Sequence, residues 1–307
     1  GNSIQSGGNE NTFVGDEAGT ATTTGDANTG IGFGALAANT TGLRNTAVGR
    51  RALVANTEGV DNDAFGRHAL EANTTGSQNV AIGRATLATS QTADDNTAVG
   101  FSAGISVTTG TKNTLIGSLS GDAFTTGSDN VALGYAALGN ETVGGRNTAV
   151  GRSALQAQQQ ATATLSYNTA LGYAAGADVS TGIENTLLGG LAGDALTTGG
   201  QNVAIGVNAL GTETTSANNV AIGREALKTQ NGATHNVAVG RTAGALVTTG
   251  SRNTFLGSQS GTATTTGERN IAVGFDALGV NTKANKNVAV GESALYALNI
   301  TTSTDSF

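Results

Sequence analysis

The sequence predicts an all-β protein, a parallel β-solenoid or β-roll of seventeen coils of about seventeen residues each. Two observations predict this fold class. An asparagine recurs every seventeen residues along most of the chain, and the same pattern of β-branched residues and glycine follows each of these asparagines. Units too short to bury their own apolar side chains fold by stacking on their neighbours. Neither a helical nor a disordered chain explains such a pattern.

The composition argues against ordinary globular domains. The 307 residues include 47 glycines, only 4% aromatic and 12% charged residues, and no Pro, Cys, Met or Trp. A compact core of this size normally uses Leu, Phe, Trp and Met, whereas this chain relies on Ala, Val, Ile and Leu. The lack of cysteine excludes disulfides and thiolate metal sites, and we expect no cofactor, no metal and no enzymatic activity.

Charge and hydropathy limit the partners. The formal net charge of −7 argues against a nucleic-acid partner. Apolar runs stay well short of the ~18 residues of a membrane span, so we expect no membrane insertion by this segment.

The asparagine defines the coil, and we number coil positions from it as position 0. One step, from Asn147 to Asn168, is twenty-one residues instead of seventeen. The series is Asn11, Asn28, Asn45, Asn62, Asn79, Asn96, Asn113, Asn130, Asn147, Asn168, Asn185, Asn202, Asn219, Asn236, Asn253, Asn270 and Asn287.

Positions 1 to 3 predict a strand. Position 1 is Thr, Val or Ile in sixteen of seventeen coils, with Asp63 the exception, and position 3 is always Val, Ile, Leu or Phe. Small residues, mostly alanine, separate them at position 2, which is a period of two. Position 14 is glycine in eleven coils, which predicts a second corner and a unit of strand, corner, strand and corner.

Position 4 is glycine in every coil, which indicates positive φ or a backbone approach too close for a Cβ atom. Stacked coils place each asparagine over the next, where side-chain amides can form a hydrogen-bonded ladder. The alternative is a corner residue that tolerates left-handed φ. The structural ladder residues are Asn45, Asn62, Asn79, Asn96 and Asn113, with Gly49, Gly66, Gly83, Gly100 and Gly117.

Side-chain volumes predict one packed interior. Position 8 is Leu in ten coils and Gly in seven, and position 2 is large only at Phe13, Leu115, Leu187 and Phe255, always in a coil with Gly at position 8. We expect the large apolar residues at positions 1, 3 and 8 to be the buried ones. Their burial is small beside the entropy of ordering seventeen residues, which favours further burial between chains.

Position 5 carries the candidate ligand-binding stripe. If exposed, it suits carbohydrate, phosphate or acidic surfaces; the alternative role is packing between chains. Stacked arginines should repel each other unless Glu58 or Glu71 lies between them. The stripe comprises Arg50, Arg67, Arg84, Phe101, Tyr135, Arg152, Tyr173, Arg224, Arg241 and Phe275, together with Phe33.

Three minor features remain. The four extra residues lie within 156–164 and form either a binding loop or a plain bulge. His68 and His235 occupy different coil positions, so we expect solvated surface side chains. Paired threonines such as Thr40 and Thr41 raise ice binding as an alternative, although adjacent residues of a strand point to opposite sides.

A family resemblance adds expectations. Asn79-Val80-Ala81-Ile82-Gly83, Asn202-Val203-Ala204-Ile205-Gly206 and Asn219-Val220-Ala221-Ile222-Gly223 resemble the head repeats of YadA-like trimeric autotransporter adhesins. Longer stretches, such as Asn45 to Gly76, resemble repeats of bacterial and phage tail-fibre-domain proteins. The resemblance covers about residues 11–295 and implies a left-handed β-roll in a homotrimeric fibre, displayed outside the cell on a bacterial surface or virion, with a glycan or protein receptor.

These expectations divide the chain into an irregular N-terminal cap (1–10), the repeat domain (11–295) and an irregular tail (296–307). A monomeric carbohydrate- or ice-binding solenoid stays open as the alternative to the fibre.

Overall fold

The computed structural model describes residues 10–296 and shows a parallel β-solenoid of coils of about seventeen residues. Within that range it contains no helix. The chain forms two compact units. The first runs to Val150 and adds Gln159–Leu165, and the second holds Gly151–Gln158 and the chain from Ser166 onward. Except for Glu10 and Tyr296, the predicted irregular ends lie outside the described residues.

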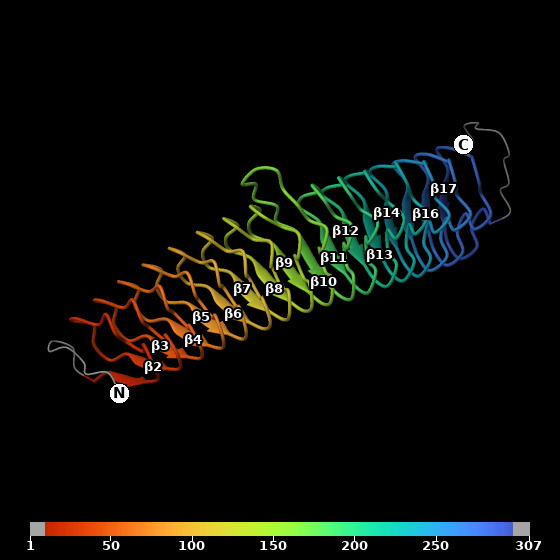
Figure 1. Ribbon diagram of the computed structural model, residues 1–307. Coiled ribbons are helices and arrows are strands. Elements are labelled where there is room, and N and C mark those ends of the chain that lie inside the picture. Colours follow the sequence, from red (N-terminus) through yellow and green to blue (C-terminus); the bar gives the residue numbers. More distant parts are fainter. Residues whose placement is uncertain (1–9, 297–307) are drawn as a thin grey trace. The chain divides into compact units, whose positions relative to one another are not determined.

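Each coil contributes one three-residue strand (Figure 1). The first unit contains β1 (Thr12–Val14), β2 (Thr29–Ile31), β3 (Thr46–Val48), β4 (Asp63–Phe65), β5 (Val80–Ile82), β6 (Thr97–Val99), β7 (Thr114–Ile116), β8 (Val131–Leu133) and β9 (Thr148–Val150). The second contains β10 (Thr169–Leu171), β11 (Thr186–Leu188), β12 (Val203–Ile205), β13 (Val220–Ile222), β14 (Val237–Val239), β15 (Thr254–Leu256), β16 (Ile271–Val273) and β17 (Val288–Val290).

Strands within a unit pair in parallel with the next strand along the chain, and the register joins equal coil positions. Between β3 and β4, Ala47 pairs with Ala64 and Val48 with Phe65. Equivalent residues therefore lie directly over one another, as the repeat predicts.

The position-4 glycine ends each strand for both predicted reasons. Gly49 has a φ of 139°, and a Cβ atom there would lie 2.5 Å from the carbonyl oxygen of Gly66 in the next coil. A side chain at this corner would therefore meet both backbone strain and a steric clash.

The predicted second strand is wrong. Positions 6 and 8 adopt left-handed backbone conformations on ordinary residues, as at Arg51 (φ 59°) and Leu53 (φ 48°). Backbone hydrogen bonds between coils nevertheless continue in this segment. The Leu53 N–H, for example, donates to the Ala69 carbonyl of the next coil at 3.0 Å. A left-handed L-residue costs about 1–2 kcal/mol. Complete burial of the Leu53 side chain offsets that cost.

Burial along the strands corrects the expectation that positions 1 and 3 are the buried ones. Successive strand residues point to opposite sides. Position 2 points inward, as Ala47 and Ala64 show with no exposed area, so positions 1 and 3 point outward.

The predicted volume compensation is confirmed. A Cβ atom at Gly121 would lie 2.8 Å from Leu115 Cδ2 of the same coil, and one at Gly193 would lie 2.8 Å from Leu187 Cδ2 of its coil. Large side chains at position 2 thus occupy the space left by glycine at position 8.

Candidate interaction surface

The outward side chains at positions 1, 3 and 5 form a surface in both units that is rich in exposed large apolar side chains, and we call it the strand face. Leu133 on β8 is 41% exposed and Leu171 on β10 is 52% exposed. Within residues 10–296, all but five of the exposed large apolar side chains lie at these positions. The five exceptions are Leu165, Tyr167, Leu246, Leu295 and Tyr296.

Concentration on one face distinguishes this surface from scattered exposed leucines. The period-two pattern that points alanine inward also aligns Val, Ile, Leu and Phe outward in every coil. Large contiguous apolar patches on soluble proteins mark sites of interaction. The strand face is therefore the candidate functional site.

All eleven predicted stripe residues, Phe33 included, point outward and are exposed. The structure brings Arg50, Arg67 and Arg84 together in consecutive coils, between Phe33 and Phe101. The Arg50 guanidinium lies 5.8 Å from the centre of the Phe33 ring, and that of Arg84 lies 5.5 Å from the Phe101 ring. These contacts draw the two outer arginines toward aromatic partners.

The rest of the stripe is more dispersed. Arg152 lies 5.9 Å from the Tyr173 ring, and Arg224 and Arg241 occupy adjacent coils. Arg224 also bonds to Glu225 at 3.1 Å. Serine-bearing coils separate Tyr135 from Phe101, and Phe275 from Arg241.

Among the described residues, neither Glu58 nor Glu71 pairs with the arginines of the stripe. Glu71 bonds to Arg51 at 3.1 Å and to His68 Nδ1 at 2.6 Å, and no ion pair within residues 10–296 joins Glu58 to the stripe. His68 is half-buried in this contact, which corrects the expectation of a solvated side chain. His235 is exposed, with Nδ1 3.0 Å from the Thr234 hydroxyl.

The asparagine ladder runs through the interior. The Asn45 Oδ1 atom accepts bonds from the backbone N–H and the Nδ2 of Asn62, at 3.0 and 3.1 Å. The Asn45 Nδ2 donates to the Gly59 carbonyl at 2.8 Å. The left-handed conformation falls on the preceding residue, such as Arg44 (φ 53°), and not on the asparagine. The ladder asparagines Asn62, Asn79, Asn96 and Asn113 are buried in the same arrangement.

Sequence reasoning missed a second buried polar column at position 11. Asn73 donates to Asn56 and Asn56 to Asn39, both at 2.8 Å. The buried Glu213 Oε1 accepts the N–H groups of three successive residues, Thr214, Thr215 and Ser216, at 2.9, 3.1 and 2.9 Å.

A sequence signal for this second column exists. Position 11 is Asn, Ser, Glu or Gln in nine of the ten coils with Leu at position 8, and Val, Phe or Leu in five of the seven with Gly. The apolar side chain needed to fill the interior thus comes from one position or the other.

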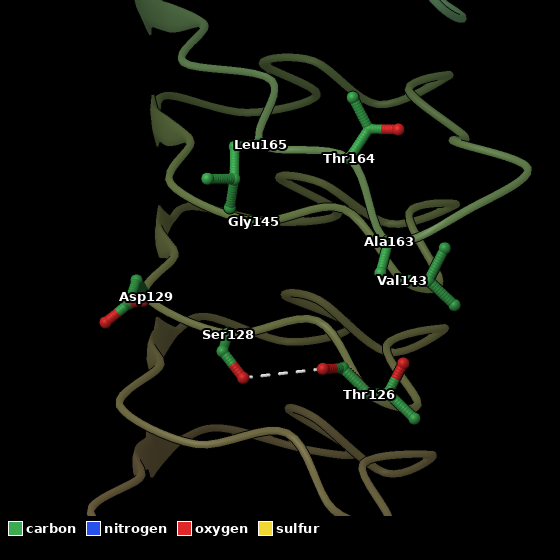
Figure 2. A pocket seen from close by; sticks show the side chains of 8 residues that line it. All are labelled: Thr126, Ser128, Asp129, Val143, Gly145, Ala163, Thr164 and Leu165. Carbon is green, nitrogen blue, oxygen red and sulfur yellow. Dashed lines mark hydrogen bonds between the residues drawn. The ribbon is translucent and has the colours of Figure 1, made fainter.

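The four-residue insertion lies along the coil before it. The Gly145 N–H donates to the Thr164 carbonyl at 3.1 Å. A hollow of about 200 Å³ lies between the insertion and this coil. Figure 2 shows the residues that line it, with the Ser128 hydroxyl donating to the Thr126 carbonyl. Asp129 is its one charged lining residue, and it lies 3.9 Å from Arg146.

Few titratable groups are perturbed. A bidentate contact with Arg44, at 2.6 and 2.8 Å, lowers the pKa of Asp61. Partial burial raises the pKa values of Asp122 and Asp194, which occupy position 9 in two coils.

Among residues 10–296, no three His, Cys, Asp or Glu side chains gather closely enough to hold a metal ion, and no helix has the length and hydropathy to cross a membrane. The chain matches no family model and no curated protein.

Proposed function

We propose that this protein is a non-enzymatic structural and adhesive segment of an extracellular fibre, on a bacterial surface or a virion. Three copies associate side by side, and the assembly holds or displays receptor-binding elements. The observation that carries the proposal is the strand face, whose position 3 is apolar in every coil and which one chain leaves partly exposed in each unit. The repeat resemblance supports the number of copies and the location.

The energetics favour self-association. Fully burying a Val, Leu, Ile or Phe side chain contributes about 1.5–3 kcal/mol, so the half-exposed side chains of this face gain about 1 kcal/mol each. Many coils contribute such a side chain, and their sum exceeds the several kcal/mol that association costs in rigid-body freedom. Copies that share this face along their length gain the most.

The oligomeric mass tests the proposal. Sedimentation equilibrium should give three times the chain mass of 30.1 kDa. The double variant Ile82→Glu with Leu133→Glu places charge on the strand face and should be monomeric. Thr75→Glu with Thr109→Glu adds the same charge at exposed positions away from that face and should keep the wild-type mass. A monomeric wild-type protein would refute the fibre proposal.

The exposed arginine–aromatic contacts favour a second candidate, a monomeric solenoid that binds acidic carbohydrate. A glycan array would test this candidate with the triple variant Arg50→Ala, Arg67→Ala, Arg84→Ala. Weaker binding by the variant would support carbohydrate binding at the stripe, and unchanged binding would rule out the stripe as the carbohydrate site. No observation favours ice binding, because threonine hydroxyls such as that of Thr40 donate to backbone carbonyls, here Thr57 at 3.0 Å.

A further inference from the structure

One coil of the strand face carries opposite charges at its two ends. Asp63, at position 1 of β4, is the only charged residue at position 1 in the chain, and Arg67 occupies position 5 of the same coil. Both side chains are exposed, and within residues 10–296 neither has an ion pair or a side-chain hydrogen bond. Phe65, 41% exposed, lies between them along the chain.

The neighbouring coils do not neutralise this pair. Arg50 and Arg84, on either side of Arg67, lean toward Phe33 and Phe101, and leave Arg67 in the middle without an aromatic partner. Asp63 lies between Thr46 and Val80 in a column that is otherwise uncharged. Burying the strand face would leave both charges buried and unpaired unless each met an opposite charge. An unpaired buried charge is strongly destabilising.

The two charges do not pair within one chain. Positions 1 and 5 are separated by the rest of β4 and by the Gly66 corner, and no ion pair joins Asp63 to Arg67 within residues 10–296. When parallel copies surround a common axis in register, the position-1 edge of one strand face meets the position-5 edge of the next copy at the same height. Such a head-to-tail interface closes into a ring.

We propose that Asp63 of one copy pairs with Arg67 of a second copy, and that this contact fixes the copies parallel and in register. The proposal rests on the self-association proposed above and names its partner and contact. A slip of two coils would set Asp63 against Phe33 or Phe101 and leave it unpaired. A slip of one coil would draw Arg50 or Arg84 from its ring.

Cysteine cross-linking tests the register, because the chain contains no cysteine of its own. The variant Asp63→Cys with Arg67→Cys should form intermolecular disulfides under mild oxidation, up to a covalent ring on a non-reducing gel. The control Asp63→Cys with Phe101→Cys is offset by two coils, about 10 Å along the stack, which exceeds the Cα separation that a disulfide spans. It should stay uncross-linked.

Removing the charges gives a second measurement. Asp63→Asn and Arg67→Gln should each raise the dissociation constant of the assembly on the order of tenfold, as expected for a desolvated charge pair. The double variant should be little weaker than either single variant, because both remove the same contact.

The outcomes separate the two proposals. A monomeric wild-type protein overturns self-association itself. An oligomeric wild type whose control pair cross-links instead of the 63/67 pair, or whose single variants behave additively, overturns the register contact alone. A covalent dimer in place of a ring supports the contact and overturns the trimer.

Discussion

Replacing one ladder asparagine should destabilise the protein far more than its small side chain suggests. In Asn79→Ala, the lost Oδ1 atom no longer accepts the backbone N–H of Asn96 at 3.0 Å, and the lost Nδ2 no longer donates to the Ala93 carbonyl at 2.7 Å. Asn79 is completely buried, so both backbone groups lose their partners away from water.

The magnitude follows from those two groups. Each unsatisfied buried donor or acceptor costs about 1–3 kcal/mol, so the substitution should cost about 2–6 kcal/mol of unfolding free energy. Because stacked repeats interact mainly with their nearest neighbours, the loss should concentrate in the coils of Asn79 and Asn96.

Urea denaturation and amide hydrogen exchange measure the global and the local effect. The Asn96 amide should lose protection. Thr92→Ala, an exposed change in the same coil, should stay within about 0.5 kcal/mol of the wild type. A loss below about 1 kcal/mol with Asn96 protection intact would refute the ladder as a source of stability.

Three further predictions concern the corners and one carboxyl group. Gly49→Ala should cost at least about 3 kcal/mol in urea denaturation from strain and clash, whereas Gly190→Ala, where the nearest atom lies 4.0 Å away, should be neutral; equal losses would contradict this. Leu53→Gly should be about 1 kcal/mol more stable than Leu53→Ala, the reverse of the usual order, because the site is left-handed. Burial raises the folded-state pKa of Asp122, so that group costs stability as pH rises above the ordinary carboxyl range; Asp122→Asn should raise the melting temperature slightly at pH 7 and lose that advantage near pH 3, and an advantage independent of pH would argue against this cause.

Much of the fold was predictable because every stacked coil packs against its neighbours in the same way, so the same residue types recur at the same positions. The seventeen-residue period, the inter-coil register and the position-4 corner all follow from residues that recur at one position, such as Gly49 and Gly66. The exchange of volume between Leu115 and Gly121 was also predictable, because positions 2 and 8 of a coil vary together along the repeat.

The candidate surface was only half predictable. Position 5 was recognised as a stripe, but the apolar residues at positions 1 and 3 were expected inside. Periodicity shows that Val48 and Ala47 face opposite sides of β3 without showing which side is the interior. The prediction of a second strand failed for a related reason. Leucine disfavours the left-handed backbone conformation that Leu53 adopts, and the conformation occurs only because burial of the side chain offsets its energetic cost.

The sequence alone therefore determined the repeat length, the parallel stacking and the identity of the residues that lie over one another, because these depend on recurrence along the chain. Only the tertiary structure decided which side of each strand is interior, which aromatic partners Arg50 and Arg84 take, and that Asp63 and Arg67 stay unpaired within one chain. Those outcomes depend on the width of the interior and on the closure of the coil, which are set by all positions of a coil together.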